Sequence, residues 1–303
     1  MKDLPSEEKK RVRTRHLGEY LAWAVVAAIL AGIAYTLVTN ENYRWPVVFR
    51  YITAVSIMHG ILITLWLTVI SMVLGTALGL LLAVMRMSSL TPVSGAARLY
   101  ITFFRGTPVL VQLIFWFNVA ALYPHLSVGI PFTGISHPID VNKLMTPLTA
   151  AIVALTLNQG AYMAEIIRGG FASVPPGQVE AAACLGMSRL TTLRRVLIPQ
   201  TMPAVIPATG NQVISMLKET SLVSVLGVAD LLQSAQTIYS RTFETIPLLI
   251  VASLWYLAMT LTLSVPQSMI ERRFSRSTRR IGDHPPQVPA PEPSFAGMQG
   301  AAA

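Results

Sequence analysis

The chain has 303 residues, of which 53% are hydrophobic and only 12% are charged. Soluble domains carry about 25% charged residues, so this composition excludes a protein whose whole surface faces water. The net charge of +9 would suggest nucleic acid as a partner of a soluble protein, but cytoplasmic loops of membrane proteins also collect Lys and Arg. The one cysteine, Cys184, excludes an internal disulfide and a cysteine-based metal cluster. We expect it to be a small buried residue.

The first predicted elements are a basic leader, residues 1–16, and an apolar helix over residues 17–39. A basic leader before an apolar block also fits a signal peptide, with small residues at 32–34 for cleavage. We favour a retained membrane helix, because about 20 apolar residues exceed the ~7–15 of a signal core. Trp23 and Tyr35, near its two ends, suit the two membrane interfaces.

Five further apolar segments predict a total of six membrane spans, since a hydrocarbon layer of about 30 Å needs roughly 20 apolar helical residues. They cover about residues 57–84, 107–122, 147–167, 203–217 and 246–270, and a short amphipathic stretch, 96–104, precedes the second of them. The polar segment 124–146 is rich in Pro and Gly, which argues against a helix through it. The Pro-, Ala- and Gly-rich residues 281–303 should be a disordered tail.

The distribution of basic residues predicts the orientation of the six spans. With the N-terminus inside, the inner segments hold 18 Lys and Arg and the outer segments hold five. Because inner loops are enriched in Lys and Arg, both termini are expected in the cytoplasm. Lys218 is the uncertain member of the outer set, because it can also lie within the membrane.

The sequence contains no zinc-protease helix, nucleophile elbow or phosphate-binding loop. The five histidines are scattered, with no spacing that would bring two of them together on one helix. We therefore predict no catalytic residue and no metal site. If the protein pumps a substrate, the energy must come from a partner.

The distribution of basic residues predicts that the segment 168–202 lies in the cytoplasm. This segment contains several Gly and Pro residues. Residues 178–185 can form a short helix that Gly186 ends, since Gly suits the left-handed cap position. Ser188 is a natural N-cap for a second short helix through residue 196, which Pro199 stops. Two interpretations stay open here: an ordinary interfacial loop, or a rigid helical knob that docks onto a soluble partner. Three arginines give the second helix a basic face: Arg189, Arg194 and Arg195.

This segment resembles the EAA loop of ABC importer membrane subunits. Glu180, Ala181 and Ala182 are followed by three residues, Gly186, nine residues and Val-Leu-Ile-Pro ending at Pro199. The family has Ile-x-Leu-Pro there, so this chain has Val196 in place of the Ile and Ile198 in place of the Leu. Three further stretches resemble the polar amino acid branch, the histidine/glutamine/glutamate type permeases: 104–108, 161–170 and 217–222.

The resemblance covers about residues 57–271 and implies a type I ABC importer transmembrane fold. That fold is all-α and membrane-spanning, with a five-helix core, and this chain would add one extra N-terminal helix. It further implies a multi-pass protein of the bacterial inner membrane that translocates polar amino acids. The loop 168–202 would carry the coupling helix, seated in a cleft of the ATPase. Glu180 would fix it by charge-assisted hydrogen bonds, Ala181 and Ala182 would permit close approach, and Gly186 would let the backbone turn.

The implied partners are two ATP-binding subunits, a second permease that is the same or a related chain, and a periplasmic amino-acid-binding protein. ATP and Mg²⁺ would be used by the ATPase, and this chain would bind no cofactor. A secondary transporter or channel would instead show charged relays through several spans or an internal repeat. An intramembrane enzyme would need a catalytic constellation.

Several polar residues within the spans are candidates for the substrate path, because polar groups in a membrane face partners or water. Asn158 and Gln159 can line a path or hydrogen-bond between helices. Glu165 is expected near the cytoplasmic surface, where Arg168 can pair with it in a mainly structural role. Gly75 and Gly79 form a Gly-x-x-x-Gly face suited to close helix packing.

Asn211, Gln212, Lys218 and Glu219 form the second candidate group for the path. The fifth span carries two prolines near its start, and its charged pair follows about 15 residues in. A broken helix there would offer backbone and both charges to a zwitterionic amino acid. The alternative, a charged pair at the outer interface, stays open.

Overall fold

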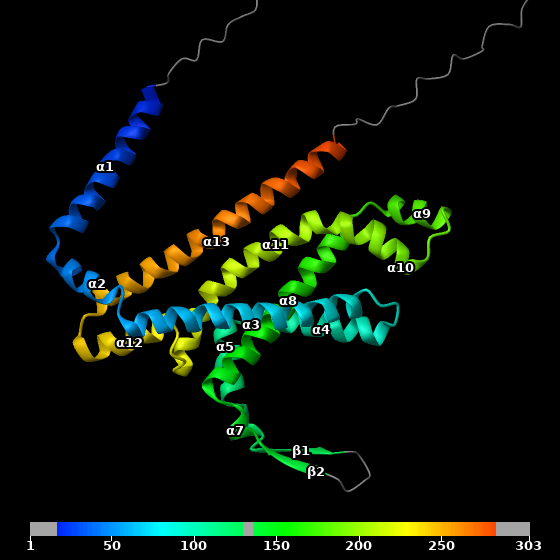
Figure 1. Cartoon of the computed structure of the whole chain (residues 1–303), viewed down its shortest axis with the longest axis horizontal. Coiled ribbons are helices and arrows are strands. Elements are labelled where there is room, and N and C mark those ends of the chain that lie inside the picture. Colours follow the sequence, from blue (N-terminus) through cyan, green and yellow to red (C-terminus); the bar gives the residue numbers. More distant parts are fainter. Residues whose placement is uncertain (1–16, 130–135, 283–303) are drawn as a thin grey trace, which may run out of the picture.

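The computed structural model describes residues 17–129 and 136–282. The first half contains these elements (Figure 1): α1 (Leu17–Thr39), η1 (Glu41–Tyr43), α2 (Trp45–Tyr51), α3 (Val55–Arg86), α4 (Thr91–Gly106), α5 (Val109–Phe117), α6 (Val119–Leu122), β1 (His125–Gly129), β2 (Ser136–Asp140) and α7 (Val141–Leu144). The second half contains α8 (Pro147–Ala172), α9 (Pro176–Cys184), α10 (Arg189–Thr192), η2 (Leu193–Leu197), α11 (Ile198–Glu219), η3 (Thr220–Leu226), α12 (Leu231–Thr242) and α13 (Thr245–Gly282).

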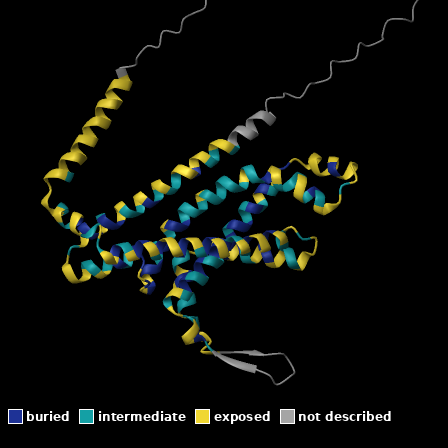
Figure 2. Cartoon of the chain, in the orientation of Figure 1, coloured by how far each residue is buried: buried dark blue, intermediate teal, exposed yellow. Residues whose placement is uncertain are grey.

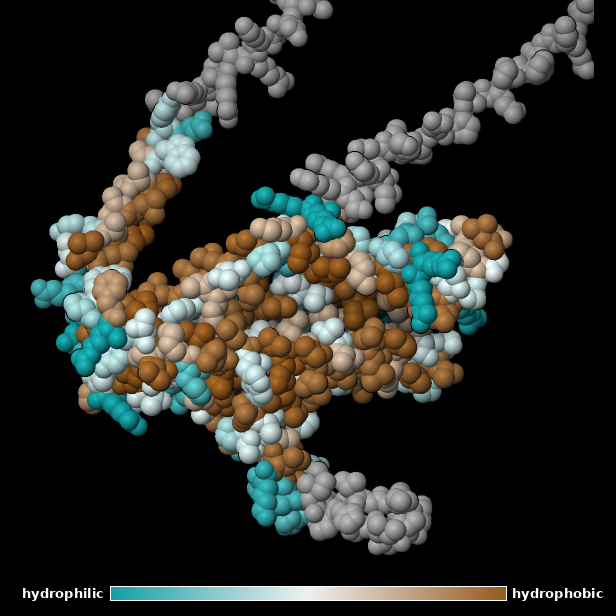
Figure 3. Space-filling model, viewed as in Figure 1, coloured by the Kyte–Doolittle hydropathy of each residue, from teal (hydrophilic) through white to brown (hydrophobic). Residues whose placement is uncertain are grey.

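Four of the described helices are long and apolar enough to cross a membrane: α1, α3, α8 and α13. Two bent pairs also pass this test, α4 with α5 and the α10–η3 segment with α12, with bends of 103° and 44°. The described chain thus offers four spans, or six if each bent pair counts as one. The predicted number of six remains a prediction. Figure 3 shows apolar residues across the middle of the molecule and polar residues toward the α9–α10 end and the α2–α12 end.

The predicted span over 107–122 begins where expected but is not one helix, because α5 ends at Phe117 and the one-turn helix α6 follows Asn118. The chain forms α4, breaks at Thr107 and Pro108, and resumes as the nine-residue α5. Thr107 is extended, as expected for a residue before proline, whose ring disfavours helical backbone at the preceding position. The amphipathic stretch 96–104 lies within α4, which buries Ala97, Ile101 and Phe104 on one face.

The predicted fifth span is displaced at its start. It does not begin near Pro203, because the helix runs from Arg189 through the π-turn η2 into α11 and passes Pro203 and Pro207. The predicted fourth and sixth spans lie within α8 and α13. Since α13 continues to Gly282, the first two residues of the predicted tail, 281 and 282, are helical. The rest of that tail and residues 1–16 lie outside the described residues.

The core is built around α8, which packs along α3. Added Cβ atoms at Gly75 and Gly79 would lie 2.5 Å from Gln159 Cγ and from Met163 Cβ, respectively. The Gly-x-x-x-Gly face of α3 therefore lets the two backbones approach at a distance that any side chain would prevent. A second apolar cluster joins α2, α3, α12 and α13.

Helix α1 stands apart from this core, and Figure 2 shows it exposed along its length. None of its 18-residue apolar window is buried within the chain. Trp45 Nε1 donates to the Leu37 carbonyl at 2.8 Å, tying the end of α1 to α2. An apolar helix with satisfied backbone and so little protein contact is suited to a lipid environment.

The described residues of the segment 124–146, which are 124–129 and 136–146, contain no long helix, as predicted. β1 and β2 form an antiparallel hairpin in which His125 pairs with Asp140, and the one-turn helix α7 follows. These two strands are the exception to the all-helical architecture of the described residues.

Candidate functional site

The loop between α8 and α11 contains the two short helices that the Gly and Pro spacing predicts. Helix α9 ends in a Schellman motif, in which Gly186 N donates to Ala183 O at 2.9 Å and Met187 N to Ala182 O at 3.1 Å. Gly186 has φ +68°, the left-handed conformation that Gly adopts without a steric penalty. The backbone thus turns sharply between the two short helices.

Ser188 begins the second helix as predicted, since its Oγ accepts from Thr191 N at 3.3 Å. Pro199, however, does not stop this helix. The π-turn η2 intervenes, in which Ile198 N donates to Leu193 O, and Pro199 becomes the second residue of α11. We attribute this to the position of the proline: it follows the wider turn, at a place where a missing N–H is tolerated.

Most of this loop is exposed, including Glu180, Ala181 and the three basic-face residues Arg189, Arg194 and Arg195. Glu180 forms no ion pair or side-chain hydrogen bond with another described residue, so its carboxylate is free for a partner. Ala182 is 3% exposed and is the one buried residue of α9. The prediction that Cys184 is buried is wrong, because it lies on the exposed part of this short helix.

The loop is joined closely to the membrane helices. A Cβ at Gly170, near the end of α8, would lie 2.3 Å from Val205 Cγ2, so α8 and α11 approach closely just where the loop leaves them. Gln200 Nε2 donates to Gln178 Oε1 at 3.2 Å, linking α11 back to α9. These two contacts join α8 to α11 and α11 to α9.

Asn158 is buried between helices. Its Nδ2 donates to Phe104 O at 3.0 Å and to Gln112 Oε1 at 3.2 Å, and Gln112 in turn donates to Thr107 Oγ1 at 2.7 Å. These bonds hold the break between α4 and α5 against α8. Gln112 is a polar residue within an apolar block that the sequence reasoning missed.

Gln159 and Gln212 meet where α8 passes α11, with Gln212 Nε2 donating to Gln159 Oε1 at 3.0 Å. Gln159 is fully buried and packs on Gly75. Asn211 faces α13 instead, and its Nδ2 donates to Glu271 Oε1 at 3.3 Å. Gln159, Gln212 and Asn211 therefore hydrogen-bond between helices in this conformation, and a role in a substrate path stays a prediction.

Lys218 and Glu219 lie at the end of α11, where the α-helix gives way to the 3-10 turn η3. They line a surface hollow of about 320 Å³ together with Ser215, Ser221 and Leu222. Neither side chain forms an ion pair with another described residue. Lys218 is 20 residues beyond the start of α11, or about 30 Å at 1.5 Å per residue. This is close to one hydrocarbon thickness.

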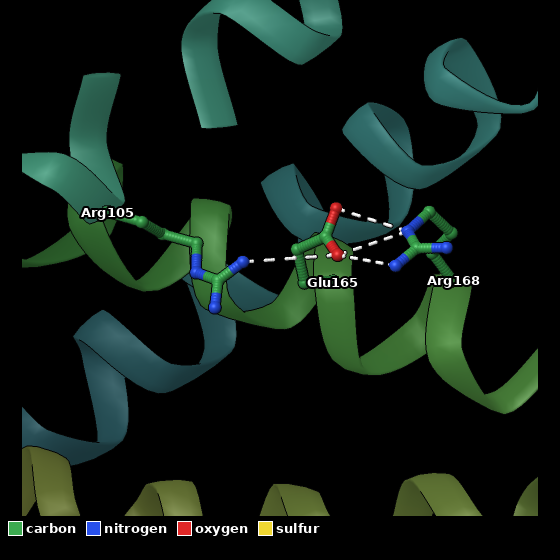
Figure 4. A network of polar contacts seen from close by, with 3 residues as sticks. All are labelled: Arg105, Glu165 and Arg168. Atoms are coloured by element: carbon green, nitrogen blue, oxygen red, sulfur yellow. Dashed lines mark hydrogen bonds and ion pairs between the residues drawn. The ribbon is translucent and has the colours of Figure 1, made fainter. Parts of the chain in front are cut away.

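Glu165 and Arg168 form the predicted pair, with Arg168 Nη2 at 2.8 Å from Glu165 Oε2. Arg105 of α4 reaches the same carboxylate oxygen at 3.9 Å from the other side (Figure 4). Its guanidinium also lies over the Tyr162 ring, 5.4 Å from the centroid. The network links α4 to α8, and Arg105 is a member that sequence reasoning did not single out.

Asp230 is a second residue that the sequence reasoning missed. It is fully buried, accepts from the backbone N–H groups of Leu232 and Gln233 as the N-cap of α12, and lies 3.2 Å from Tyr256 Oη. An Asp before an apolar run is a helix-start signal, so the N-cap could be predicted from the sequence, although the burial of Asp230 could not.

Among the described residues, no cluster of His, Cys, Asp or Glu could hold a metal ion.

Comparison with known proteins decides the family. Residues 75–276 match the model of a family described as the inner membrane component of binding-protein-dependent transport systems. The chain belongs to this family. It is thus a multi-pass membrane permease, which confirms the predicted type I importer fold, and ATP hydrolysis belongs to a separate subunit.

Three of the similar proteins are amino acid transport proteins by name. The arginine transport system permease protein ArgU of Corynebacterium glutamicum is 41% identical over 268 residues, 88% of this chain and 83% of its own. The L-cystine transport system permease protein TcyB of Bacillus subtilis is 38% identical over 250 residues, 82% of this chain and 95% of its own. A crystal structure of an amino acid ABC transporter with histidines matches the permease with TM-score 0.62 and 40% identity, covering 72% of this chain and 94% of that one.

Proposed function

We propose that this permease forms the membrane path of an ATP-driven importer for polar amino acids in the bacterial inner membrane. The observation that carries the proposal is the exposed α9–Gly186–α10 element, whose turn is set by a Schellman motif and whose second helix continues into a membrane helix. The names of the similar permeases, which include arginine and cystine transport, support amino acids as the substrate class.

In this proposal the loop 168–202 faces the cytoplasm, and α9 docks into a separate ATPase that uses ATP and Mg²⁺. Glu180 and the basic face offer both signs of charge to that partner. Closure of two ATPases would move α9 and, through the Gln178–Gln200 and Gly170 contacts, rock α8 and α11. Such rigid-body rocking alternates access to a path between two permeases, the same or related chains.

A reconstituted importer tests this function. The permease is placed in proteoliposomes with its cognate ATPase and periplasmic binding protein, and uptake of labelled arginine and cystine is measured with ATP inside. Uptake should require ATP, the ATPase and the binding protein together. Uptake by the permease alone down a gradient would instead identify a channel or secondary transporter.

The Lys218–Glu219 hollow is the proposed contact for the substrate's carboxylate and ammonium groups. Replacing Lys218 or Glu219 with Ala should raise the KM for a charged amino acid by roughly fivefold, equivalent to about 1 kcal/mol for a partly exposed charge pair. Arg241→Ala, which removes an exposed cation from α12, should leave the KM unchanged. If all three variants had the KM of the unaltered protein, Lys218 and Glu219 would not contact the substrate, and the alternative of a charged pair at the membrane interface would hold.

A further inference from the structure

A second polar site lies where α3, α4 and α8 meet. It is a hollow of about 600 Å³ whose lining includes four arginines: Arg86, Arg98, Arg105 and Arg168. Glu165, the carboxylate described above, is the one acidic residue of the lining, and Tyr162 forms part of the wall. The lining therefore carries four positive charges and one negative charge, an excess of three.

The arginines fall into two pairs with different roles. Arg105 and Arg168 both contact Glu165, at 3.9 Å and 2.8 Å, and approach it from opposite sides (Figure 4). Arg86 and Arg98 form no ion pair with a carboxylate of the described chain. Two guanidinium groups at this hollow thus lack a carboxylate within ion-pair distance in the described chain, and a bound anion would offset the repulsion between the arginines.

We propose that this hollow binds the phosphate headgroup of an anionic phospholipid. Guanidinium groups present planar, paired donors that match phosphate oxygens bidentately, and basic pockets between membrane helices suit acidic headgroups. This site is distinct from the coupling helix α9 and from the Lys218–Glu219 hollow. It shares no lining residue with that hollow, and its one residue from the loop 168–202 is Arg168, which lies in α8.

The position of the hollow favours a lipid over a free anion. Arg86 is the last residue of the apolar helix α3, and Arg168 lies four residues before the end of α8, so the hollow is at the level where membrane helices leave the hydrocarbon. On the same two helices, α3 and α4, large apolar side chains stay exposed: Val84 is 62%, Leu99 73% and Phe103 56% exposed. A phospholipid can contact both kinds of surface at once, with its phosphate at the arginines and its acyl chains along the exposed apolar surface of α3 and α4.

Lipid binding to the purified importer complex tests the proposal. Phosphatidylglycerol and phosphatidylcholine are titrated into the complex in mild detergent, and bound lipid is counted by native mass spectrometry. Phosphatidylglycerol should bind more tightly, and Arg86→Gln with Arg98→Gln should weaken it by about tenfold or more, given the contribution of each basic residue near a membrane surface. Arg273→Gln, which removes an exposed arginine of α13 outside the hollow, should not change binding.

Arg98→Gln alone covers the case in which the double variant does not fold. Arg98 is an exposed side chain on α4, and its single replacement should weaken phosphatidylglycerol binding by roughly fivefold. Binding equal to that of the unaltered protein would overturn the proposal. It would also be overturned if glycerol 3-phosphate, which lacks acyl chains, bound as tightly, or if the variants lost the ATPase subunits, because the arginines would then serve a free phosphate or a protein partner.

Discussion

Gly186→Val should reduce ATP-dependent uptake by at least about tenfold while the permease still reaches the membrane. Gly186 has φ +68°, and a non-glycine residue in this conformation costs about 1–2 kcal/mol, more if it is β-branched. The turn between α9 and α10 would relax, so that α9 would no longer present a fixed surface to the ATPase. The measurements are labelled amino acid uptake in proteoliposomes and the amount of ATPase that copurifies with the permease.

Two further substitutions test whether the effect of Gly186→Val comes from the backbone conformation or from the size of the new side chain. A Cβ at Gly186 would meet nothing within 4 Å, so the valine acts through the backbone rather than through a clash. Gly186→Asn should retain part of the activity, because Asn tolerates the left-handed region. Gly177→Ala, in the same loop with ordinary φ and open space, should be neutral. Full uptake by Gly186→Val would refute the coupling role of this turn.

Gly79→Ala should lower the stability of the permease by about 1–3 kcal/mol, the usual cost of overpacking a core. The added methyl would lie 2.5 Å from Met163 Cβ and 3.0 Å from the backbone N of Ala164. Neither neighbour is the end of a flexible side chain, so α3 and α8 must move apart. The change is measured as a fall in the thermal unfolding temperature of the detergent-purified protein.

Gly32→Ala is the control for the same substitution in a membrane helix. A Cβ there would meet nothing within 4 Å, so the variant reports only the smaller conformational freedom that Ala brings to the unfolded chain. Its unfolding temperature should stay equal or rise slightly. If both variants shifted by the same amount, the close approach of α3 and α8 would not contribute to stability.

The local elements were the parts that sequence reasoning could predict. Gly186 and Ser188 were assigned as a helix end and a helix start because both signals depend on residues within one turn of themselves. The apolar blocks predicted α1, α3, α8 and α13 for the same reason, since apolar length is a property of a continuous segment. The predicted span start at residue 107 agrees with the break beside Pro108, whereas the interruption at Asn118 was not predicted, because no Pro or Gly marks it.

The sequence by itself determined the membrane class of this protein, its long apolar helices and the Gly and Pro spacing of the loop between α8 and α11. Only the tertiary structure decided that Asn158, Gln159 and Gln212 bond between helices, that Asp230 is buried, and that Arg86, Arg98, Arg105 and Arg168 share one hollow. Local signals act along neighbouring residues of the chain. The environment of a polar side chain, by contrast, depends on which distant helix packs beside it, and this depends on contacts such as those of Gly75 and Gly79 with α8.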